Sequence, residues 1–179
     1  LFMAITRSLF RTLSQHVLSP AKIVTEMNNS ISDNNESNMF VTLIVGILDL
    51  ETGILKLCNA GHNPPILIYP DGQVSYLEFK TQIFVGVVED FKYSDEEVVL
   101  EKESKLFLYT DGVTEAENIN KELYGEEKLL EMLSDNASSD VRTTVNVVVD
   151  SIASHVKEAE ASDDLTILLI QYEPGTANS

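Results

Sequence analysis

A long series of strand-like segments in the middle of the chain constrains the fold most. Between residues 39 and 109 the apolar residues follow the pattern of strands, and short turns separate roughly six or seven such segments. The first, MFVTLIVGILDL (39–50), is apolar almost throughout, which predicts a central strand buried on much of both faces. Strands joined by short turns pair antiparallel, so the sequence predicts a meander-like antiparallel sheet system.

Helical periodicity appears on both sides of this series. Residues 1–14 have apolar side chains at helical spacing, and Ser19-Pro20 provides the N-cap and the first residue of a second helix. Two more amphipathic segments, 125–133 and 140–157, precede a last apolar strand, LTILLIQY. The positions expected to be buried on the first and the last helix are Leu1, Phe2, Ile5, Leu9, Leu13, Val141, Val145, Val148, Val149, Ile152 and Val156. The order of elements predicts the α+β class.

Composition excludes several classes of protein. The net charge of −17 opposes binding to nucleic acid and to anionic membrane surfaces, so neither is expected as a partner. The single cysteine, Cys58, lies in an apolar run and is expected to be a small buried hydrophobic residue. The sequence shows neither a signal peptide nor an apolar run long enough to span a bilayer, which favours a soluble cytoplasmic protein.

Two acidic corners stand beside apolar strands. Asp111 follows the run that ends before Thr110, and Asp163-Asp164 precedes the last strand. Gly112 is expected to let the backbone turn with a positive φ and approach closely whatever binds there. If the two strands, both central by composition, are antiparallel neighbours, the carboxylates converge, and such hard oxygen ligands select Mg²⁺ or Mn²⁺. The alternatives are a plain Asp-Gly turn and a plain polar loop.

Three segments occur together in one order: NAGHNPP (59–65), LYTDGVTEA (108–116) and SDDLTILLI (162–170). In this order and context they resemble the SpoIIE-type serine/threonine phosphatases, the bacterial branch of the metal-dependent protein phosphatases that includes RsbU-like regulators. The segment at residues 39–53 also resembles the strand pair before the family's AGH motif. The resemblance implies a four-layer α-β-β-α sandwich of two antiparallel sheets, with metal ions at one edge between the sheets.

The resemblance also assigns residues. Asp111 and Gly112 match the family's DG metal-binding motif, and Asp163 matches the metal-ligating acid of its last motif. His62 matches the histidine of the AGH motif, and the alternative for it is a histidine that holds the proline-rich loop by hydrogen bonds. The positions expected to support the site are Asp164, His62, Thr110 and Glu115.

The activity implied by the resemblance is hydrolysis of phosphoserine or phosphothreonine on a regulatory protein of the anti-anti-sigma (STAS) type. Two Mn²⁺ or Mg²⁺ ions would activate a water, so no catalytic residue is expected beyond that water. The phosphatase domain is expected to span residues 1–173, and residues 174–179 are expected to form a disordered tail.

The chain also departs from the family. It begins at what corresponds to the family's first helix, so the earlier strands and their metal-ligating acids are absent, which implies an N-terminally truncated domain. Two acids hold two dications poorly, and the first helix would expose an apolar face. The chain alone is therefore expected to bind Mn²⁺ weakly and to show little turnover. It is also expected to cover the exposed face either by self-association, with a homodimer as one form, or by rearrangement of its first helix. The alternative function is a catalytically silent phosphatase-like module that binds a regulatory partner.

Overall fold

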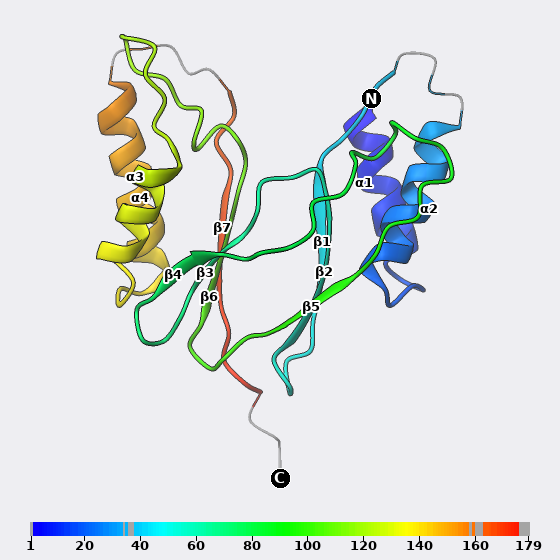
Figure 1. Cartoon of the computed structure of the whole chain (residues 1–179), viewed down its shortest axis with the longest axis horizontal. Helices are drawn as coiled ribbons and strands as arrows, with labels where there is room; N and C mark the ends of the chain where they lie inside the picture. Colours follow the sequence, from blue (N-terminus) through cyan, green and yellow to red (C-terminus); the bar gives the residue numbers. More distant parts are fainter. Residues whose placement is uncertain (1, 34, 36–37, 158, 160–162, 176–179) are drawn as a thin grey trace. The chain divides into compact units, whose positions relative to one another are not determined.

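The chain divides into two compact units (Figure 1). The structure is a computed structural model, and it describes residues 2–33, 35, 38–157, 159 and 163–175. Leu1–His62 and Phe79–Leu100 make up the first unit, and Asn63–Glu78 and Glu101–Asn178 make up the second. In the described residues each unit contains one antiparallel sheet and two helices, which confirms the predicted α+β class with two antiparallel sheets.

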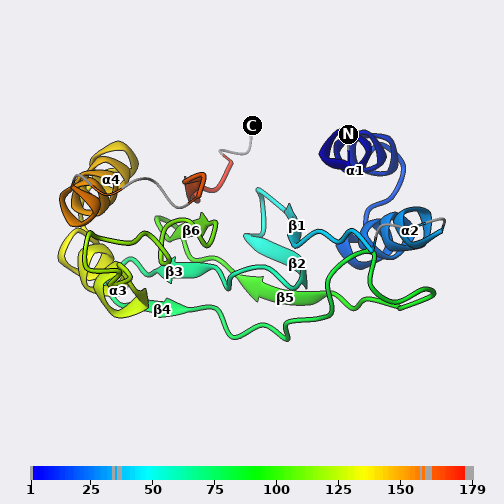
Figure 2. The same cartoon turned by 90° about the horizontal axis from the view of Figure 1, so that it is seen from above.

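The first unit is built on a three-stranded sheet. Its elements are α1 (Phe2–Leu13), α2 (Pro20–Ser32), β1 (Leu43–Leu48), β2 (Ile54–Ala60) and β5 (Glu96–Val99). The strand order is β1-β2-β5, and β2 pairs antiparallel with both neighbours. α2 packs on β1 and β2, and α1 packs on α2 (Figure 2). Thus α2 contacts the sheet directly, and α1 is joined to the sheet through α2.

The start of α2 follows directly from the local sequence. Ser19 is the N-cap, and its hydroxyl accepts a hydrogen bond from the N–H of Lys22 at 3.2 Å. Pro20 occupies the first helical position, where its missing N–H costs nothing. Asp95 adds a second cap, because its carboxylate accepts hydrogen bonds from the Ser19 hydroxyl at 2.8 Å and from the N–H of Ala21. The predicted helix start is confirmed.

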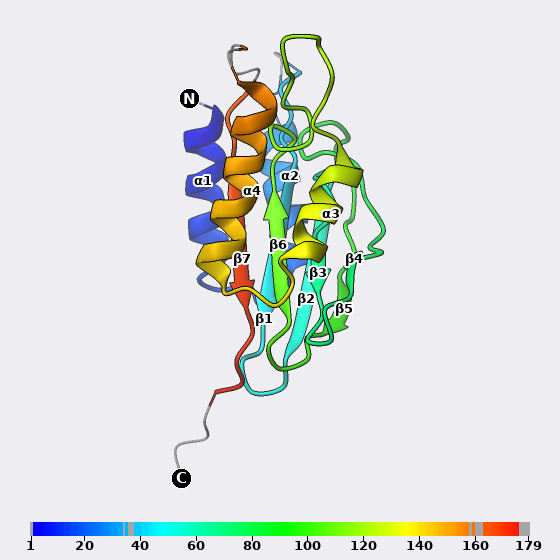
Figure 3. The ribbon, with the colours of Figure 1, turned by 90° about the vertical axis from the view of Figure 1, so that its left-hand side faces the viewer.

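The second unit is built on a four-stranded sheet. Its elements are β3 (Ile66–Ile68), β4 (Val74–Tyr76), β6 (Lys105–Tyr109), α3 (Glu126–Asp135), α4 (Val141–Val156) and β7 (Ile167–Gln171). The strand order is β4-β3-β6-β7, and every pair is antiparallel. α3 and α4 lie side by side over one face of this sheet (Figure 3).

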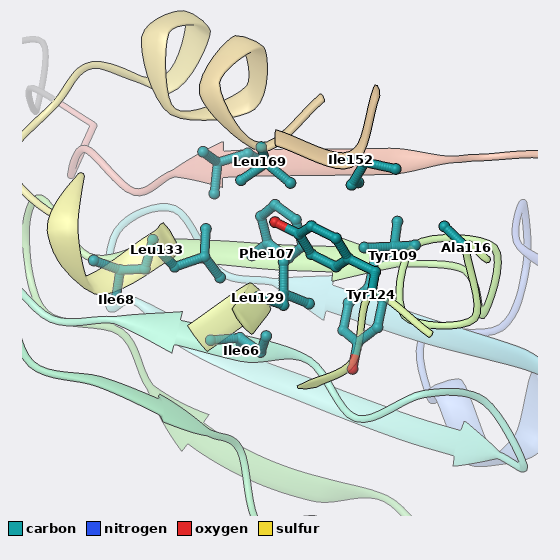
Figure 4. Packing of buried hydrophobic residues seen from close by; sticks show 12 residues of the cluster. Ile66, Ile68, Phe107, Tyr109, Ala116, Tyr124, Leu129, Leu133, Ile152 and Leu169 are labelled. Carbon is teal, nitrogen blue, oxygen red and sulfur yellow. The ribbon is translucent and has the colours of Figure 1, made fainter. Parts of the chain in front are cut away.

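A cluster of buried apolar residues joins this sheet to its helices. Phe107 of β6 is fully buried at its centre, and side chains from β3, β7, α3 and α4 surround it (Figure 4). The cluster consists of Ile66, Ile68, Phe107, Tyr109, Val113, Ala116, Tyr124, Leu129, Leu133, Val148, Ile152 and Leu169. Val113 and Ala116 belong to the segment that follows β6, so the core holds that segment in place on one side.

Composition alone predicted the wrong position within the sheet for two strands. The run at residues 39–50 predicts a central strand, but β1 begins only at Leu43 and lies at the edge of its sheet. β7 is also an edge strand, next to β6, although its sequence is as apolar as that of a central strand. The antiparallel sheet system is confirmed, but its strands do not all pair in chain order, because β5 pairs with β2 after the chain has formed β3 and β4 in the other sheet. The apolarity of a strand indicates that its faces are buried, but it does not indicate how many neighbouring strands are hydrogen-bonded to it.

Helical spacing identified most of the packed positions on the outer helices. Phe2 and Leu9 of α1 pack against the core of the first unit as predicted, but Ile5 is 45% exposed. Thr6 takes the buried place, and its hydroxyl donates to the carbonyl of Phe2 at 3.1 Å. On α4, Val149 is exposed, in contrast to the prediction. A threonine can fill a buried helical position because its hydroxyl bonds within the helix.

Some predictions fall outside these observations. Leu1 and residues 176–179 of the expected tail lie outside the described residues, as does Ser162 of the last motif. The domain boundary at residue 173 stays a prediction. Among the described helices, none combines the length and the apolarity that crossing a membrane requires.

Candidate functional site

The two acidic corners lie at the same edge of one sheet. β6 and β7 are antiparallel neighbours, and their register pairs Tyr109 with Ile167. Continuing this register by three residues brings Gly112 opposite Asp164, and a Cβ atom built on Gly112 would lie 2.5 Å from the Asp164 carbonyl oxygen. The end of one strand and the approach to the other therefore meet, as the sequence predicted for antiparallel neighbours.

Thr110 extends the pairing of β6 and β7 beyond the regular ladder. Its N–H donates to the carbonyl of Thr166 at 3.1 Å, and the N–H of Thr166 donates to the Thr110 hydroxyl at 3.1 Å. The same hydroxyl donates to the carbonyl of Asp164 at 3.3 Å. The sequence placed Thr110 among the supporting positions, and the structure shows which groups it contacts.

The backbone after Asp111 forms a tight turn. The carbonyl of Asp111 accepts the N–H of Glu115 at 2.8 Å and the hydroxyl of Thr114 at 3.4 Å. Val113 is fully buried in the core of the unit, while Asp111 and Glu115 are exposed. The turn is thus anchored from inside and presents its acids to solvent.

Gly112 has a different role from the expected one. Its φ does not lie in the left-handed region, so the prediction of a positive φ is wrong. The expected close approach is present, because the carbonyl of Asp164 occupies the place of a side chain at this position. Glycine is required here for space rather than for backbone conformation.

Asp111 and Asp163 share one local arrangement. Oδ1 of Asp111 accepts the N–H of Gly112 at 3.0 Å, and Oδ1 of Asp163 accepts the N–H of Asp164 at 2.7 Å. All three aspartates are exposed, and none of them forms an ion pair with a described Lys, Arg or His. Each fixed carboxylate therefore keeps its second oxygen available for a ligand.

These donors fit a divalent cation that retains water. Carboxylate oxygens are the ligands that Mg²⁺ and Mn²⁺ prefer, and Mg²⁺ is commonly held by one or two carboxylates together with waters and substrate phosphate. In the described part of the chain, no three His, Cys, Asp or Glu side chains are grouped so that they could hold a metal ion. The residues thus suit one side of a hydrated metal site and do not enclose an ion.

His62 lies at the end of β2, in the first unit. The buried side chain of Asn59 holds its backbone on both sides, accepting the His62 N–H at 2.8 Å and donating to the His62 carbonyl at 2.9 Å. Its ring Nδ1 lies 3.2 Å from the Thr42 hydroxyl. This geometry fits the interpretation of His62 as a residue that holds its loop by hydrogen bonds. Sequence analysis missed Thr42 and Asn59, although Asn59 opens the NAGHNPP segment.

Cys58 has the properties expected of an inert residue. It is fully buried on β2, and Gln82 Nε2 lies 3.8 Å from its sulfur. Burial, with the negative charge of Asp95 as a smaller cause, raises the pKa of the Cys58 thiol to about 12. A thiol that stays protonated is a poor nucleophile.

Comparison with known proteins gives one family over almost the whole chain. A family model described as Stage II sporulation protein E (SpoIIE) matches residues 1–173. The phosphoserine phosphatase RsbU of Bacillus subtilis is 23% identical over 172 residues, which are 96% of this chain and 50% of RsbU. The chain spans half or less of the length of the curated relatives reported for it.

Solved structures share the fold. The SiaA-PP2C domain of Pseudomonas aeruginosa matches with a TM-score of 0.82 and 20% identity, over 95% of this chain and 68% of that chain. The catalytic domain of the serine threonine protein phosphatase PstP, solved with 2 manganese ions, matches with a TM-score of 0.65 and 14% identity. That match covers 93% of this chain and 78% of the PstP domain. At these identities the likeness establishes the fold.

Proposed function

Because the chain belongs to the Stage II sporulation protein E (SpoIIE) family, we propose that residues 1–173 form the domain of a metal-dependent protein serine/threonine phosphatase. One observation carries the proposal: Asp111 and the Asp163-Asp164 pair stand at one edge of the β6–β7 pair. The name of RsbU and the manganese ions of the PstP domain support the same chemistry in this chain.

The charge of the site explains why a metal is needed. Exposed carboxylates repel a phosphate dianion, and the chain as a whole carries a net charge of −17. No described Lys or Arg forms an ion pair with Asp111, Asp163 or Asp164, so the charge of these carboxylates is not neutralised by a described side chain. A divalent cation, if these aspartates held one, would offset the local negative charge that otherwise opposes a phosphoryl group.

Each residue has a stated task in this proposal. Asp111 and Asp163 would hold the cation through their carboxylates, and Asp164 fixes the Asp163 carboxylate by donating its N–H. Gly112 gives the space in which the two acidic segments come together. When bound, the divalent ions supply an activated water and offset the charge of the transferring phosphoryl group. Glu115 stands one turn beyond Asp111 as a further acid at this edge.

The proposed substrate is a phosphoserine or phosphothreonine on a cytoplasmic regulatory protein of the anti-anti-sigma (STAS) type. The name of RsbU supports phosphoserine as the group that is hydrolysed. The exposed position of the acids suits a phosphorylated side chain that a folded partner presents at its surface. A small metabolite would be served better by an enclosed pocket.

One observation favours a second candidate function. The described residues contain no group of three metal-ligating side chains, and two acids are few for two dications. A phosphatase-like module that binds its regulatory partner without hydrolysing it fits this count. Turnover separates the two candidates, because both predict binding of the partner.

The test is hydrolysis of a phosphoserine peptide by the natural full-length protein. Release of phosphate should require millimolar Mn²⁺ or Mg²⁺, stop when EDTA removes the metal, and return when metal is restored. Metal-independent turnover would contradict the proposed chemistry. Partner binding with no turnover at saturating metal would instead support the silent module.

A further inference from the structure

One side chain connects the two acidic segments directly. The Thr110 hydroxyl accepts the N–H of Thr166 at 3.1 Å and donates to the carbonyl of Asp164 at 3.3 Å. Both bonds cross from the end of β6 to the segment that leads into β7. They stand beyond the last regular pair of the ladder, Tyr109 with Ile167. A side chain here continues the connection between the strands.

These bonds lie one residue from each of the two acids proposed to hold the metal. Thr110 precedes Asp111, and Asp164, whose carbonyl it holds, follows Asp163. The distance between the carboxylates therefore depends on how firmly the two segments are joined. Asp111 and Asp163 each bond within their own segment, to the N–H of the next residue. Those bonds orient the carboxylates, so the spacing between the segments depends on the bonds of Thr110, two through its hydroxyl and one from its backbone N–H to the Thr166 carbonyl at 3.1 Å.

Gly112 restricts the same carbonyl. A Cβ at Gly112 would stand 2.5 Å from the Asp164 oxygen, so the backbone of the DG turn packs directly against it. With the Thr110 hydroxyl bonded to it, this oxygen is held by one residue on either side of Asp111. A carbonyl used in this way serves the backbone connection.

We propose that Thr110 is a positioning residue that sets the spacing of Asp111 and Asp163 and thereby the affinity of the site for a divalent cation. The inference rests on the proposed function, because it concerns the same metal. A hydroxyl is required, since the group must both accept from Thr166 and donate to Asp164. Groups that orient metal ligands from the outer shell typically contribute a factor of about 10 to 100 in affinity.

The test compares variants of the natural full-length protein, with Mn²⁺ as the probe. The electron paramagnetic resonance signal of free Mn²⁺ gives the binding constant without any measurement of activity. Thr110→Val keeps the shape of the side chain and removes the hydroxyl, and it should weaken Mn²⁺ binding by about tenfold. Thr110→Ser keeps the hydroxyl and should restore an affinity close to that of the unaltered protein.

A matched control separates positioning from general stability. The hydroxyl of Thr25 also donates to a carbonyl, that of Ala21 at 2.7 Å, and also accepts an N–H, that of Tyr93 at 3.2 Å. Thr25 belongs to α2 in the first unit. Thr25→Val should therefore lower the melting temperature as Thr110→Val does and leave Mn²⁺ affinity unchanged. If Thr110→Val does not fold, Thr110→Ala removes the same hydroxyl without adding a methyl group.

The outcomes distinguish the inference from the proposed function. If Asp111→Asn loses Mn²⁺ binding while Thr110→Val binds as the unaltered protein does, the positioning role is wrong and the metal site stands. If Thr25→Val weakens binding as much as Thr110→Val, the effect is one of general stability and the inference is overturned. If the unaltered protein binds no Mn²⁺, or Asp111→Asn binds it equally well, the metal site itself fails and the inference falls with it.

Discussion

Two strand ends in this chain carry the residues that sequence analysis selected, and they are built differently. At the end of β2, Asn59 holds the backbone of His62 on both sides, and the Thr42 hydroxyl lies beside its ring. At the end of β6, the backbone is held just as firmly, but Asp111 points its carboxylate to solvent and has no described cation as a partner.

The difference separates residues that position from residues that bind. The hydrogen bonds that hold His62 stabilise its loop. An exposed carboxylate on a fixed backbone is available for a cation and costs little to bring into place. We therefore expect changes at the β6–β7 edge to reduce activity strongly and changes around His62 to have smaller effects.

The largest effect is expected for Asp111→Asn in the full-length protein. The amide keeps the shape of the side chain but removes a charge that the cation needs, so phosphatase activity should fall by about 100-fold or more. The fold should stay intact, and the rise in melting temperature on adding Mn²⁺ should be smaller than in the unaltered protein.

Asp71 is a matched control for Asp111. It also precedes a glycine in a turn of the second unit, is exposed, and accepts the N–H of Gln73 through Oδ1 at 2.9 Å. Asp71→Asn should leave Mn²⁺ dependence and turnover unchanged. Equal losses for the two variants would show that the loss reflects total charge rather than a site at Asp111.

Gly112→Ala should have the next largest effect. Its Cβ would meet the Asp164 carbonyl, which must move, so we expect a loss of about 1–3 kcal/mol in the free energy of unfolding together with reduced Mn²⁺ affinity. Gly72→Ala is the control, because Gly72 has a φ of +90° and a Cβ there would make only an ordinary contact, with the Cβ of Ala137 at 3.9 Å. That variant should lose stability and keep metal affinity. Denaturant titration and Mn²⁺ titration measure the two quantities.

A smaller effect is expected for Thr42→Val beside His62. The change removes the hydroxyl next to the ring, and a single hydrogen bond of this kind contributes about 1 kcal/mol to stability. Activity should fall by less than about tenfold, which is the factor that 1.36 kcal/mol represents. A loss as large as that of Asp111→Asn would give His62 a direct part in the chemistry and would remove the contrast between the two strand ends.

The smallest effect is expected at Cys58. Because burial raises its pKa to about 12, the thiol should react with a thiol reagent at pH 8 only after unfolding. The folded pKa lies above the ordinary value of 9.0, so Cys58 should not alter stability below pH 9 and should lower it as the pH rises toward 12. Rapid labelling of the native protein at pH 8 would contradict this description of the first unit.

The placement of the acidic corners could be predicted from the sequence for a physical reason. In an antiparallel pair, the residues after one strand lie beside the residues before the other. The pairing of β6 with β7 is therefore sufficient to bring Asp111 near Asp163-Asp164. The two apolar runs of strand length allowed that pairing as a condition, and the structure shows it. The positions of β1 and β7 at the edges of their sheets could not be predicted in this way. An apolar run indicates that a strand is buried, but it does not indicate how many strands pair with it.

The hydrogen bonds from side chains to backbone groups were also not predicted. Thr110 bonds to Asp164 and Thr166, which lie more than fifty positions further along the chain, and the contact depends on the register of two strands. Asn59 needs only a turn of three residues to hold His62, so a local pattern existed there and was missed. For Gly112, the predicted close approach of the backbone is present, but the predicted positive φ is not. A glycine in a turn therefore does not by itself indicate a positive φ.

The central claim is that Asp111 and Asp163 hold a divalent cation together. The most direct measurement is a crystal structure of the natural protein soaked in Mn²⁺, with the anomalous signal locating the ion. We predict a manganese peak in contact with the carboxylates of both Asp111 and Asp163 at the β6–β7 edge. A peak bound elsewhere, or an edge without manganese at saturating concentration, would contradict the account.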